Sequence, residues 1–210
     1  DDEALGCGGT IARHVDEGDE VEVCVLCSRA YDRVYDQDAI RSEKECAKVA
    51  QEVLAYERLR FLDLPDEQLY LHFQEVLDGL EAVVEEVRPG VVYTCHGGDL
   101  HQDHRTVAHA SNIALRAFSA PSVRRVLSYE VPSGTDQVFP GTSPAFDPTV
   151  YVDIEGQLAR KLDAMAAYDR ESRAFPHPRS PEALTAQARV RGAQSGLSAA
   201  EAFVLLRETV

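Results

Sequence analysis

The chain of 210 residues has a formal net charge of −15, with 44% hydrophobic and 27% charged residues. This length and composition are typical of one globular domain with its own core, so we expect residues 1–210 to form a single domain. The acidic balance argues against a nucleic-acid partner, because phosphate backbones require basic patches and the longest basic run is Arg124-Arg125. No run approaches the ~20 apolar residues of a membrane helix, and no secretory signal opens the chain. We therefore expect a cytoplasmic protein without a membrane span.

Hydrophobic spacing and breaker residues predict the elements in chain order. The first half of the chain is predicted to contain a helix beginning at Asp1-Asp2, a strand over 20–27, a polar loop over 28–37, a helix over 38–55, a strand over 58–62 ended by Asp63-Leu64-Pro65-Asp66, a helix over 69–87 and a strand over 91–95. A helix over 103–119, a strand over 123–129, a long loop over 130–150 and a strand over 150–154 follow. The last predicted elements are a helix over 155–169, a proline-dense segment over 175–181, a helix to about 192 and a strand over 202–207. The alternation predicts an α/β fold of three layers, Rossmann-like, with a mainly parallel sheet flanked by helices.

The five cysteines show no spacing typical of a disulfide framework. Cys24 and Cys27 form a C-x-x-C, but they lie within an apolar strand, where their side chains point to opposite faces. We expect buried free thiols in a reducing cytoplasm rather than a redox pair or a zinc site.

The densest group of chemically active side chains follows the predicted strand 91–95. Between His96 and His104 lie three imidazoles and two carboxylates, and four of the seven histidines fall between residues 96 and 109. His101 and His104, with Asp103 between them, can present two ring nitrogens and a carboxylate to one small volume, as a divalent metal requires. The alternative is a polar surface loop with scattered histidines.

With these residues in view, the chain resembles the zinc-dependent LmbE/PIG-L deacetylases. The resemblance rests on Asp1-Asp2-Glu3-x-Leu5-Gly6-x-Gly8-Gly9 and on Asp99-x-His101-x-Asp103-His104, about 100 residues apart. It extends to Phe61-Leu62-x-x-Pro65-Asp66 and to Ala200-Glu201-Ala202-Phe203. It implies a metal-dependent hydrolase that removes an N-acetyl group from a small molecule containing an amino sugar, and it favours a homo-oligomer.

The resemblance also implies roles for individual residues. Asp2 and His104 would bind one zinc ion per chain, although Fe²⁺ or Co²⁺ suits the same ligands. Asp1 would be the general base, His101 would steady the oxyanion or protonate the leaving amine, and Asp103 would orient a histidine. The expected substrate-binding residues are Arg41, Asp99, His177 and Arg179. For Arg41 the alternative is a solvated helix charge, and for His177 and Arg179 a surface linker held by prolines.

One departure from the family pattern concerns the residues before Asp1. The resemblance implies a strand ending in His-Pro there, with the histidine as a further zinc ligand, and neither is among the 210 residues. Either the sequence is a fragment, or the protein has lost this ligand and strand. We favour a fragment, because a sheet without an inner strand would expose a long apolar gap. If the loss is real, His96 or His101 would have to substitute.

Two other functions remain open at this point. Clusters of histidine and aspartate also serve other metallohydrolases, of which a phosphoesterase is the most plausible, and two metals about 4 Å apart would favour it. A non-catalytic relative that lacks the first zinc ligand is the third reading.

Overall fold

The computed structural model describes residues 1–28 and 36–210, so the predicted polar loop over 28–37 lies largely outside the described residues. The chain divides into two compact units. Unit 1 consists of residues 1–25, 29–61 and 151–202, and unit 2 consists of residues 26–28, 62–150 and 203–210. Each unit is therefore built from segments that are distant in the sequence.

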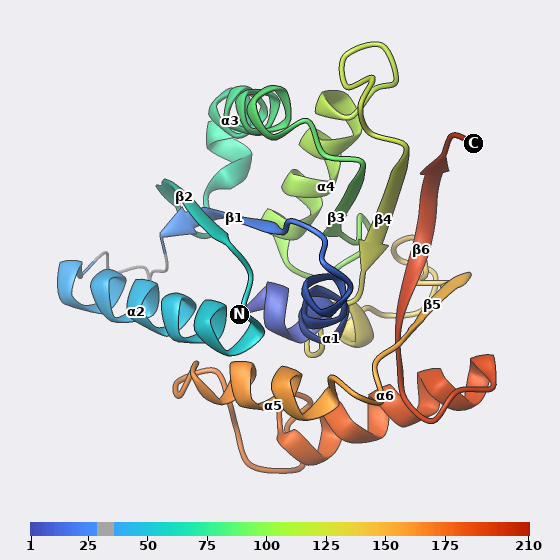
Figure 1. Ribbon diagram of the computed structural model, residues 1–210. Helices are drawn as coiled ribbons and strands as arrows, with labels where there is room; N and C mark the ends of the chain where they lie inside the picture. Colours follow the sequence, from blue (N-terminus) through green and yellow to red (C-terminus); the bar gives the residue numbers. More distant parts are fainter. Residues whose placement is uncertain (29–35) are drawn as a thin grey trace. The chain divides into compact units, whose positions relative to one another are not determined.

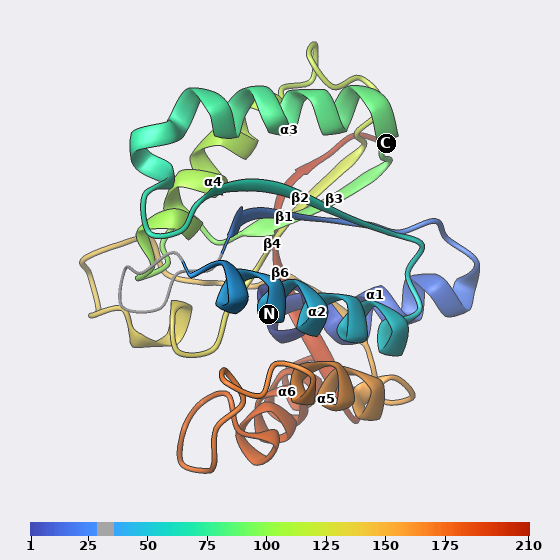
Figure 2. The ribbon, with the colours of Figure 1, turned by 90° about the vertical axis from the view of Figure 1, so that its left-hand side faces the viewer.

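Four helices form most of unit 1: α1 (Asp2–Glu17), α2 (Gln37–Leu54), α5 (Leu158–Ala166) and α6 (Pro181–Ser195). Helix α5 packs against α1, α2 and α6 (Figure 2). Local signals set two of these helix ends. Gly18 ends α1 with a φ of 89°, a conformation that glycine adopts without steric cost. Ser180 caps α6 by accepting the Ala183 N–H, and Pro181 follows at the first helical position.

Strands β1 (Glu22–Ser28) and β2 (Arg58–Pro65) form a two-stranded sheet. The prediction that β2 ends before Asp63 is wrong, because the strand continues to Pro65. The Asp63 carboxylate accepts a hydrogen bond of 2.7 Å from the Ser28 hydroxyl, which ties the ends of the two strands together. Pro65 is the last residue of β2, which is an edge strand of this two-stranded sheet, and edge strands tolerate proline.

The four-stranded sheet has the order β3-β4-β6-β5, with β3 at Val91–Cys95, β4 at Arg125–Tyr129, β5 at Val150–Asp153 and β6 at Ala200–Glu208. Within unit 2, β3 and β4 are parallel and in register from Val91–Arg125 to Cys95–Tyr129 (Figure 1). The part of β6 that begins at Phe203 is antiparallel to β4. The α/β prediction is confirmed, but this sheet is mixed rather than mainly parallel. The three-layer arrangement stays a prediction.

The helices of unit 2 pack on β3 and β4. A 3-10 turn, η1 (Leu69–His72), precedes α3 (Phe73–Val87), so the single helix predicted over 69–87 is divided in two. Val84 of α3 and Val92 of β3 contact a core cluster around Leu115 and Val126. Helix α4 (Gln102–Ala114) ends five residues before residue 119, where the prediction placed its end. Turn hydrogen bonds follow the helix, and the first of them joins the Leu115 N–H to the Ser111 carbonyl.

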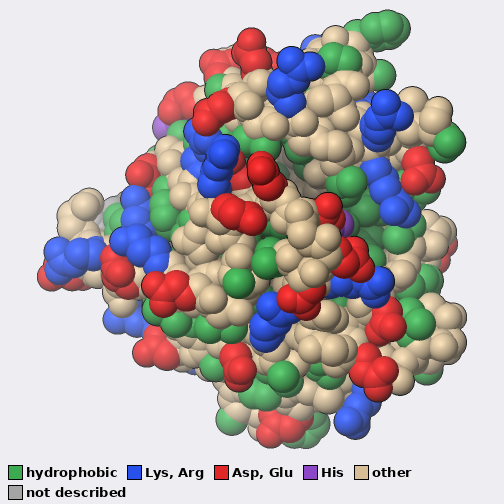
Figure 3. Space-filling view, in the orientation of Figure 1, with side chains coloured by type: hydrophobic (Ala, Val, Ile, Leu, Met, Phe, Trp, Pro, Cys, Tyr) green, Lys and Arg blue, Asp and Glu red, His purple; other side chains and the backbone are tan. Residues whose placement is uncertain are grey.

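The described surface fits the expectations from composition. On the face in Figure 3, basic side chains of the described residues lie among acidic ones rather than in one continuous area. None of the helices in the described part of the chain combines the length and apolarity needed to cross a membrane. None of the five cysteines, all of which the structure describes, forms a disulfide, as predicted, but Cys24 and Cys27 are half-buried rather than buried. Partial burial still raises the pKa of the Cys24 thiol to about 11. A thiol with that pKa is protonated at neutral pH, so Cys24 is a poor metal ligand or nucleophile.

Candidate active site

The histidine-rich segment connects β3 to α4 in unit 2. It begins at His96, directly after β3, and reaches α4 through two glycines. A Cβ atom on Gly98 would lie 2.0 Å from the Pro144 carbonyl oxygen and 2.7 Å from His96 Nε2, so only glycine fits there. His96 itself is buried, lies 3.1 Å through Nε2 from the same carbonyl and packs edge-on against Phe146. His96 thus fixes the long loop beyond residue 130 to the candidate site.

His101 is the N-cap residue of α4. Its Nδ1 accepts a hydrogen bond of 3.2 Å from the Asp103 N–H, one of the amides at the helix start that lack a partner within the helix. A ring nitrogen that accepts a hydrogen bond carries no proton, so the neutral ring bears its proton on Nε2. The ring centroid lies 4.8 Å from that of His104. The cap therefore fixes both the tautomer of His101 and its place beside the second histidine.

Asp99 is buried in unit 2 and contacts the His104 ring. Only 1% of Asp99 is exposed, and its Oδ1 lies 3.1 Å from His104 Nδ1. The carboxylate also accepts hydrogen bonds from the His101 N–H (2.7 Å) and the Thr135 hydroxyl (2.6 Å). Burial would raise the pKa of Asp99, but these partners, His104 first, outweigh it and lower the pKa below its ordinary value. Asp99 is thus an ionised, fixed partner for His104.

The contacts of Asp99 bear on the substrate-binding role expected of it. Its carboxylate is buried and its observed partners are His104, the His101 N–H and the Thr135 hydroxyl, so a substrate contact of Asp99 stays a prediction. The close fit extends to Gly134, where a Cβ atom would lie 2.8 Å from Asp99 Oδ1. Asp99 therefore faces the Nδ1 side of the His104 ring, and Nε2 is the other ring nitrogen.

Asp103 has a structural role that the sequence did not predict. Its carboxylate accepts hydrogen bonds from the backbone N–H groups of Glu67 (2.6 Å) and Leu69 (3.1 Å). Burial raises the pKa of Asp103, aided by the nearby charge of Asp66 and opposed by these amides and by His101. The side chain thus anchors the segment after β2 to the start of α4, and its hydrogen bonds are to backbone rather than to a histidine ring.

The acidic residues of the first motif lie at the start of α1 in unit 1. Asp1 is the N-cap residue and Asp2 the first helical residue, where carboxylates suit the positive end of the helix dipole. Asp1 Oδ2 accepts a hydrogen bond of 2.8 Å from Arg179, whose same nitrogen also donates to Glu171 at 2.5 Å. Arg179 therefore lies beside the predicted general base and is held there by a second carboxylate.

The other predicted residues of unit 1 take different positions. The Arg41 side chain is 73% exposed and pairs with Asp38 one turn earlier on α2. That contact fits the alternative of a solvated helix charge, and a substrate contact of Arg41 stays a prediction. His177 Nδ1 accepts a hydrogen bond of 3.1 Å from the backbone N–H of Arg179. This hydrogen bond closes a turn at residues 177–179, next to the Arg179 side chain.

Several residues of this arrangement carried no signal in the sequence. Thr135 comes from a 3-10 turn, η2 (Thr135–Gln137), in a loop whose composition indicates only irregular structure. The Tyr168 hydroxyl of unit 1 donates a hydrogen bond of 2.5 Å to Glu3, and although Glu3 belongs to the first motif, nothing in the sequence indicated Tyr168 as its partner. Only a motif that included these positions could have pointed to them.

Two groups of three potential metal ligands occur among the described residues. His14, Glu17 and Asp19 lie at the exposed end of α1. Cys27, Asp66 and Asp103 lie together in unit 2, but the Cys27 thiol donates to Asp66 and both Asp103 oxygens accept backbone N–H groups. This second group is thus explained by its own hydrogen bonds. The predicted ligands Asp2 and His104 belong to different units, and their joint coordination stays a prediction.

Comparisons with known proteins identify a matching family model, related proteins and similar solved structures. The family model described as GlcNAc-PI de-N-acetylase (PIG-L) matches residues 1–115. The uncharacterized deacetylase YaiS of Escherichia coli (strain K12) is 29% identical over 138 residues, which cover 63% of this chain and 70% of YaiS. Diacetylchitobiose deacetylase of Thermococcus kodakarensis is 26% identical over 183 residues, 81% of this chain and 66% of that protein. Among solved structures, the conserved protein TT1542 from Thermus thermophilus aligns with a TM-score of 0.75 at 26% identity, covering 100% of this chain and 91% of that one.

Proposed function

The chain belongs to the GlcNAc-PI de-N-acetylase (PIG-L) family, and we propose that it is a zinc-dependent hydrolase that removes the acetyl group from an N-acetylated amino sugar. The observation that carries the proposal is the pair of histidines at the start of α4. Asp99 lies against one ring and the helix terminus holds the other, so that both rings have a defined orientation. The named relatives, both deacetylases, support the reaction.

The residues present fit a zinc ion in their chemistry. A neutral imidazole held by a carboxylate through Nδ1 is the usual form of a zinc-binding histidine, and His104 has that arrangement with Asp99. His104 Nε2 and the carboxylate of Asp2 would hold the ion, together with the histidine that the family pattern places before Asp1. Zinc, when bound, polarises the acyl carbonyl and lowers the pKa of water near neutrality.

The residues of this chain then divide the proton transfers between them. Asp1 would take a proton from the attacking water as the water oxygen adds to the acyl carbon and the carbonyl oxygen becomes an oxyanion. Asp1 would then give this proton to the amine as the oxyanion collapses and the amide C–N bond breaks. His101 would donate its Nε2 proton as a hydrogen bond to the oxyanion and keep it, because its Nδ1 accepts from the helix. This choice assigns protonation of the amine to Asp1 rather than to His101.

Arg179 would serve this reaction by holding Asp1 rather than by binding the substrate. Its guanidinium donates to both Asp1 and Glu171, which fixes the direction of the Asp1 carboxylate. The other oxygen of the Asp1 carboxylate would then face the attacking water. His177 supports the same turn through its bond to the Arg179 amide.

The finer features expected from the resemblance belong to the same proposal. They are one zinc per chain, a cytoplasmic location, a homo-oligomer and a three-layer, Rossmann-like arrangement. Of the two alternatives, a phosphoesterase has no support from the named relatives, and the geometry at His104 favours a metal-binding enzyme over a non-catalytic relative.

The test uses the full-length natural protein, dialysed and then analysed for metal by elemental mass spectrometry. We expect about one zinc per chain and release of acetate, in equal amount to free amine, from diacetylchitobiose or N-acetylglucosamine. A nitrophenyl phosphate should release no phosphate under the same conditions. Phosphate release without acetate would favour the phosphoesterase, and protein with neither metal nor activity would overturn the proposal.

Replacing Asp99 by asparagine should reduce the affinity for zinc about 10- to 100-fold, because His104 loses the carboxylate that fixes its ring. The chelator concentration that halves the zinc content measures this change. Thr135→Val is the matched control, since it removes one hydrogen bond from the same carboxylate and leaves the contact with His104. Equal zinc affinity in Asp99→Asn and the natural protein would show that His104 needs no orienting partner.

A further inference from the structure

Helix α1 is buried on all sides over much of its length. The nine consecutive residues from Ala4 to Ala12 are buried, and most of them are small. Two glycines allow its neighbours in unit 1 to approach the helix backbone. A Cβ atom on Gly8 would lie 3.2 Å from Lys161 Cγ, and one on Gly9 would lie 2.7 Å from Ile154 Cγ2. The backbone of α1 is therefore closely approached by side chains of α5 and of the residue that follows β5.

A buried ion pair uses this access. Lys161 of α5 and Glu201 of β6 lie 2.5 Å apart, with side chains only 5% and 4% exposed. Glu201 accepts hydrogen bonds from the backbone N–H groups of Gly9 (3.0 Å) and Thr10 (2.7 Å). Lys161 donates to the carbonyl oxygen of Leu5 at 2.7 Å. Both members of the pair thus bind the same turn of α1.

These backbone groups are notable because they lie inside a helix. In a regular α-helix, the Gly9 N–H donates to the Leu5 carbonyl. Here the Gly9 N–H also donates to the Glu201 carboxylate, and the Leu5 carbonyl also accepts from the Lys161 ammonium. A buried ion pair generally adds little stability over well-packed apolar residues, because removing the charges from water offsets their attraction. Stability alone is therefore a weak reason for this pair.

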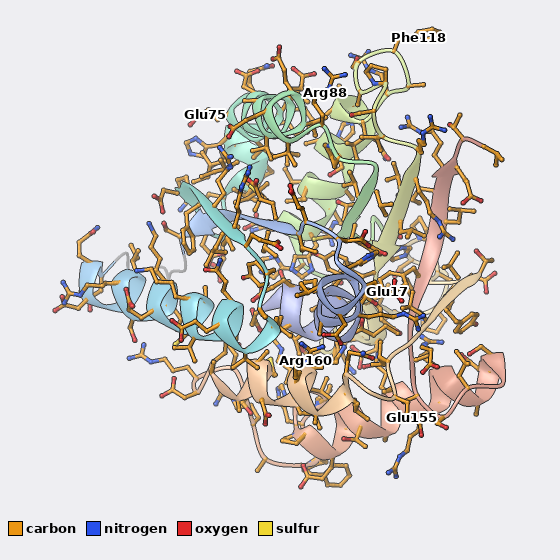
Figure 4. All side chains as sticks on the ribbon, in the orientation of Figure 1. Glu17, Glu75, Arg88, Phe118, Glu155 and Arg160 are labelled. Atoms are coloured by element: carbon orange, nitrogen blue, oxygen red, sulfur yellow. The ribbon has the colours of Figure 1, made fainter. Side chains whose placement is uncertain are left out.

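The pair has a short path to the acidic motif. Leu5, whose carbonyl binds Lys161, donates its own N–H to the Asp1 carbonyl at 2.9 Å. The contact with Lys161 thus lies one turn from Asp1 and Asp2. A second basic residue on α5, Arg160, also donates to an α1 carbonyl, but at Ala12 and thus farther from Asp1 (Figure 4).

We propose that Lys161 and Glu201 are positioning residues that set the axial position and rotation of α1, and thereby the place of the Asp1 and Asp2 carboxylates. The catalytic part of this inference rests on the proposed function. The inference assigns a purpose to a lysine and a glutamate that touch neither the substrate nor the metal, and it explains why charged groups are bound to the interior of a glycine-containing helix.

The test compares the double variant Lys161→Met/Glu201→Gln with Glu201→Gln alone and with Arg160→Met. Glu201→Gln leaves the Lys161 charge buried without its partner, so this variant should lose stability. The double variant removes both charges, and its urea midpoint should return toward that of the natural protein. Its kcat should nevertheless stay reduced about tenfold or more with an unchanged KM, since a misplaced base slows the chemical step. Arg160→Met should keep kcat within about twofold, because it changes a contact farther from Asp1.

Hydrogen exchange of the peptide over residues 2–12 provides a readout that does not depend on activity. In the double variant, exchange in this peptide should accelerate about tenfold or more, while the α6 peptide exchanges as before. Unchanged exchange over 2–12 would overturn the positioning role even if the natural protein had no deacetylase activity. A double variant that recovers kcat together with its stability would also overturn it, since the pair would then serve stability alone.

Discussion

Replacing His104 by alanine is expected to remove the bound zinc and to lower kcat/KM by about 10³-fold or more. His104 is the histidine whose Nδ1 faces the buried Asp99, so its Nε2 is the nitrogen that we assign to the metal. The side chain lies at the start of α4 and caps nothing, so the helix itself should persist. Zinc content after dialysis and acetate release, measured on the same sample, check the result.

The matched control is His109→Ala, which removes another histidine from the same helix. His109 is exposed and contacts the Phe73 ring, with centroids 4.9 Å apart. This variant should keep both its zinc and its activity. Retention of zinc in His104→Ala, at the level of the His109→Ala control, would mean that other residues hold the metal.

Replacing Asp1 by asparagine is expected to lower kcat about 10²- to 10⁴-fold while the zinc content stays the same. Asparagine has the same shape and still accepts a hydrogen bond from Arg179, but it cannot take a proton from water. The two variants should therefore separate the two functions of the site, because His104→Ala loses metal and activity together and Asp1→Asn loses activity alone. Steady-state kinetics and elemental analysis measure the two quantities.

Asp16→Asn serves as the control for Asp1→Asn, since it makes the same chemical change near the opposite end of α1. Asp16 is paired with Arg160 and Gln157 on the surface of unit 1. Its replacement should leave kcat within about twofold, because it touches no group of the reaction. Full activity in Asp1→Asn would remove Asp1 from the mechanism and leave the general base to another residue.

Much of the element order followed from local patterns, because those patterns are set by neighbours in the chain. Helix α4 begins at Gln102, one residue before the predicted helix over 103–119, and Gly18 ends α1, just before the predicted strand over 20–27. The errors occurred where distant contacts decide. β2 continues past Asp63 because Ser28, 35 positions earlier, bonds its carboxylate. β6 is antiparallel to β4, and its direction depends on where the chain returns after α6, which local spacing does not encode.

The candidate site was predicted as a set of residues rather than as a set of contacts. The motif indicated Asp99, His101, Asp103 and His104, and all four lie at the β3–α4 connection. The contacts of Asp99 depend on side-chain direction within a loop, which has no regular period from which to predict it, and those of Asp103 depend on a segment more than 30 residues earlier in the chain. In the structure Asp99 contacts His104, and Asp103 accepts hydrogen bonds from the backbone of residues 67 and 69. Thr135 could not be predicted at all, because the loop that contains it has no pattern.

The position of His101 as a helix cap carries a trade-off between durability and catalysis. Serine, threonine, asparagine and aspartate stabilise a helix start better than other residues, so a histidine there leaves part of the available stability unused. Selection for a more heat-resistant protein would favour replacing His101 by one of those residues, and the catalytic ring would be lost with it. A library screened only for thermal resistance would therefore tend to enrich inactive variants at this position.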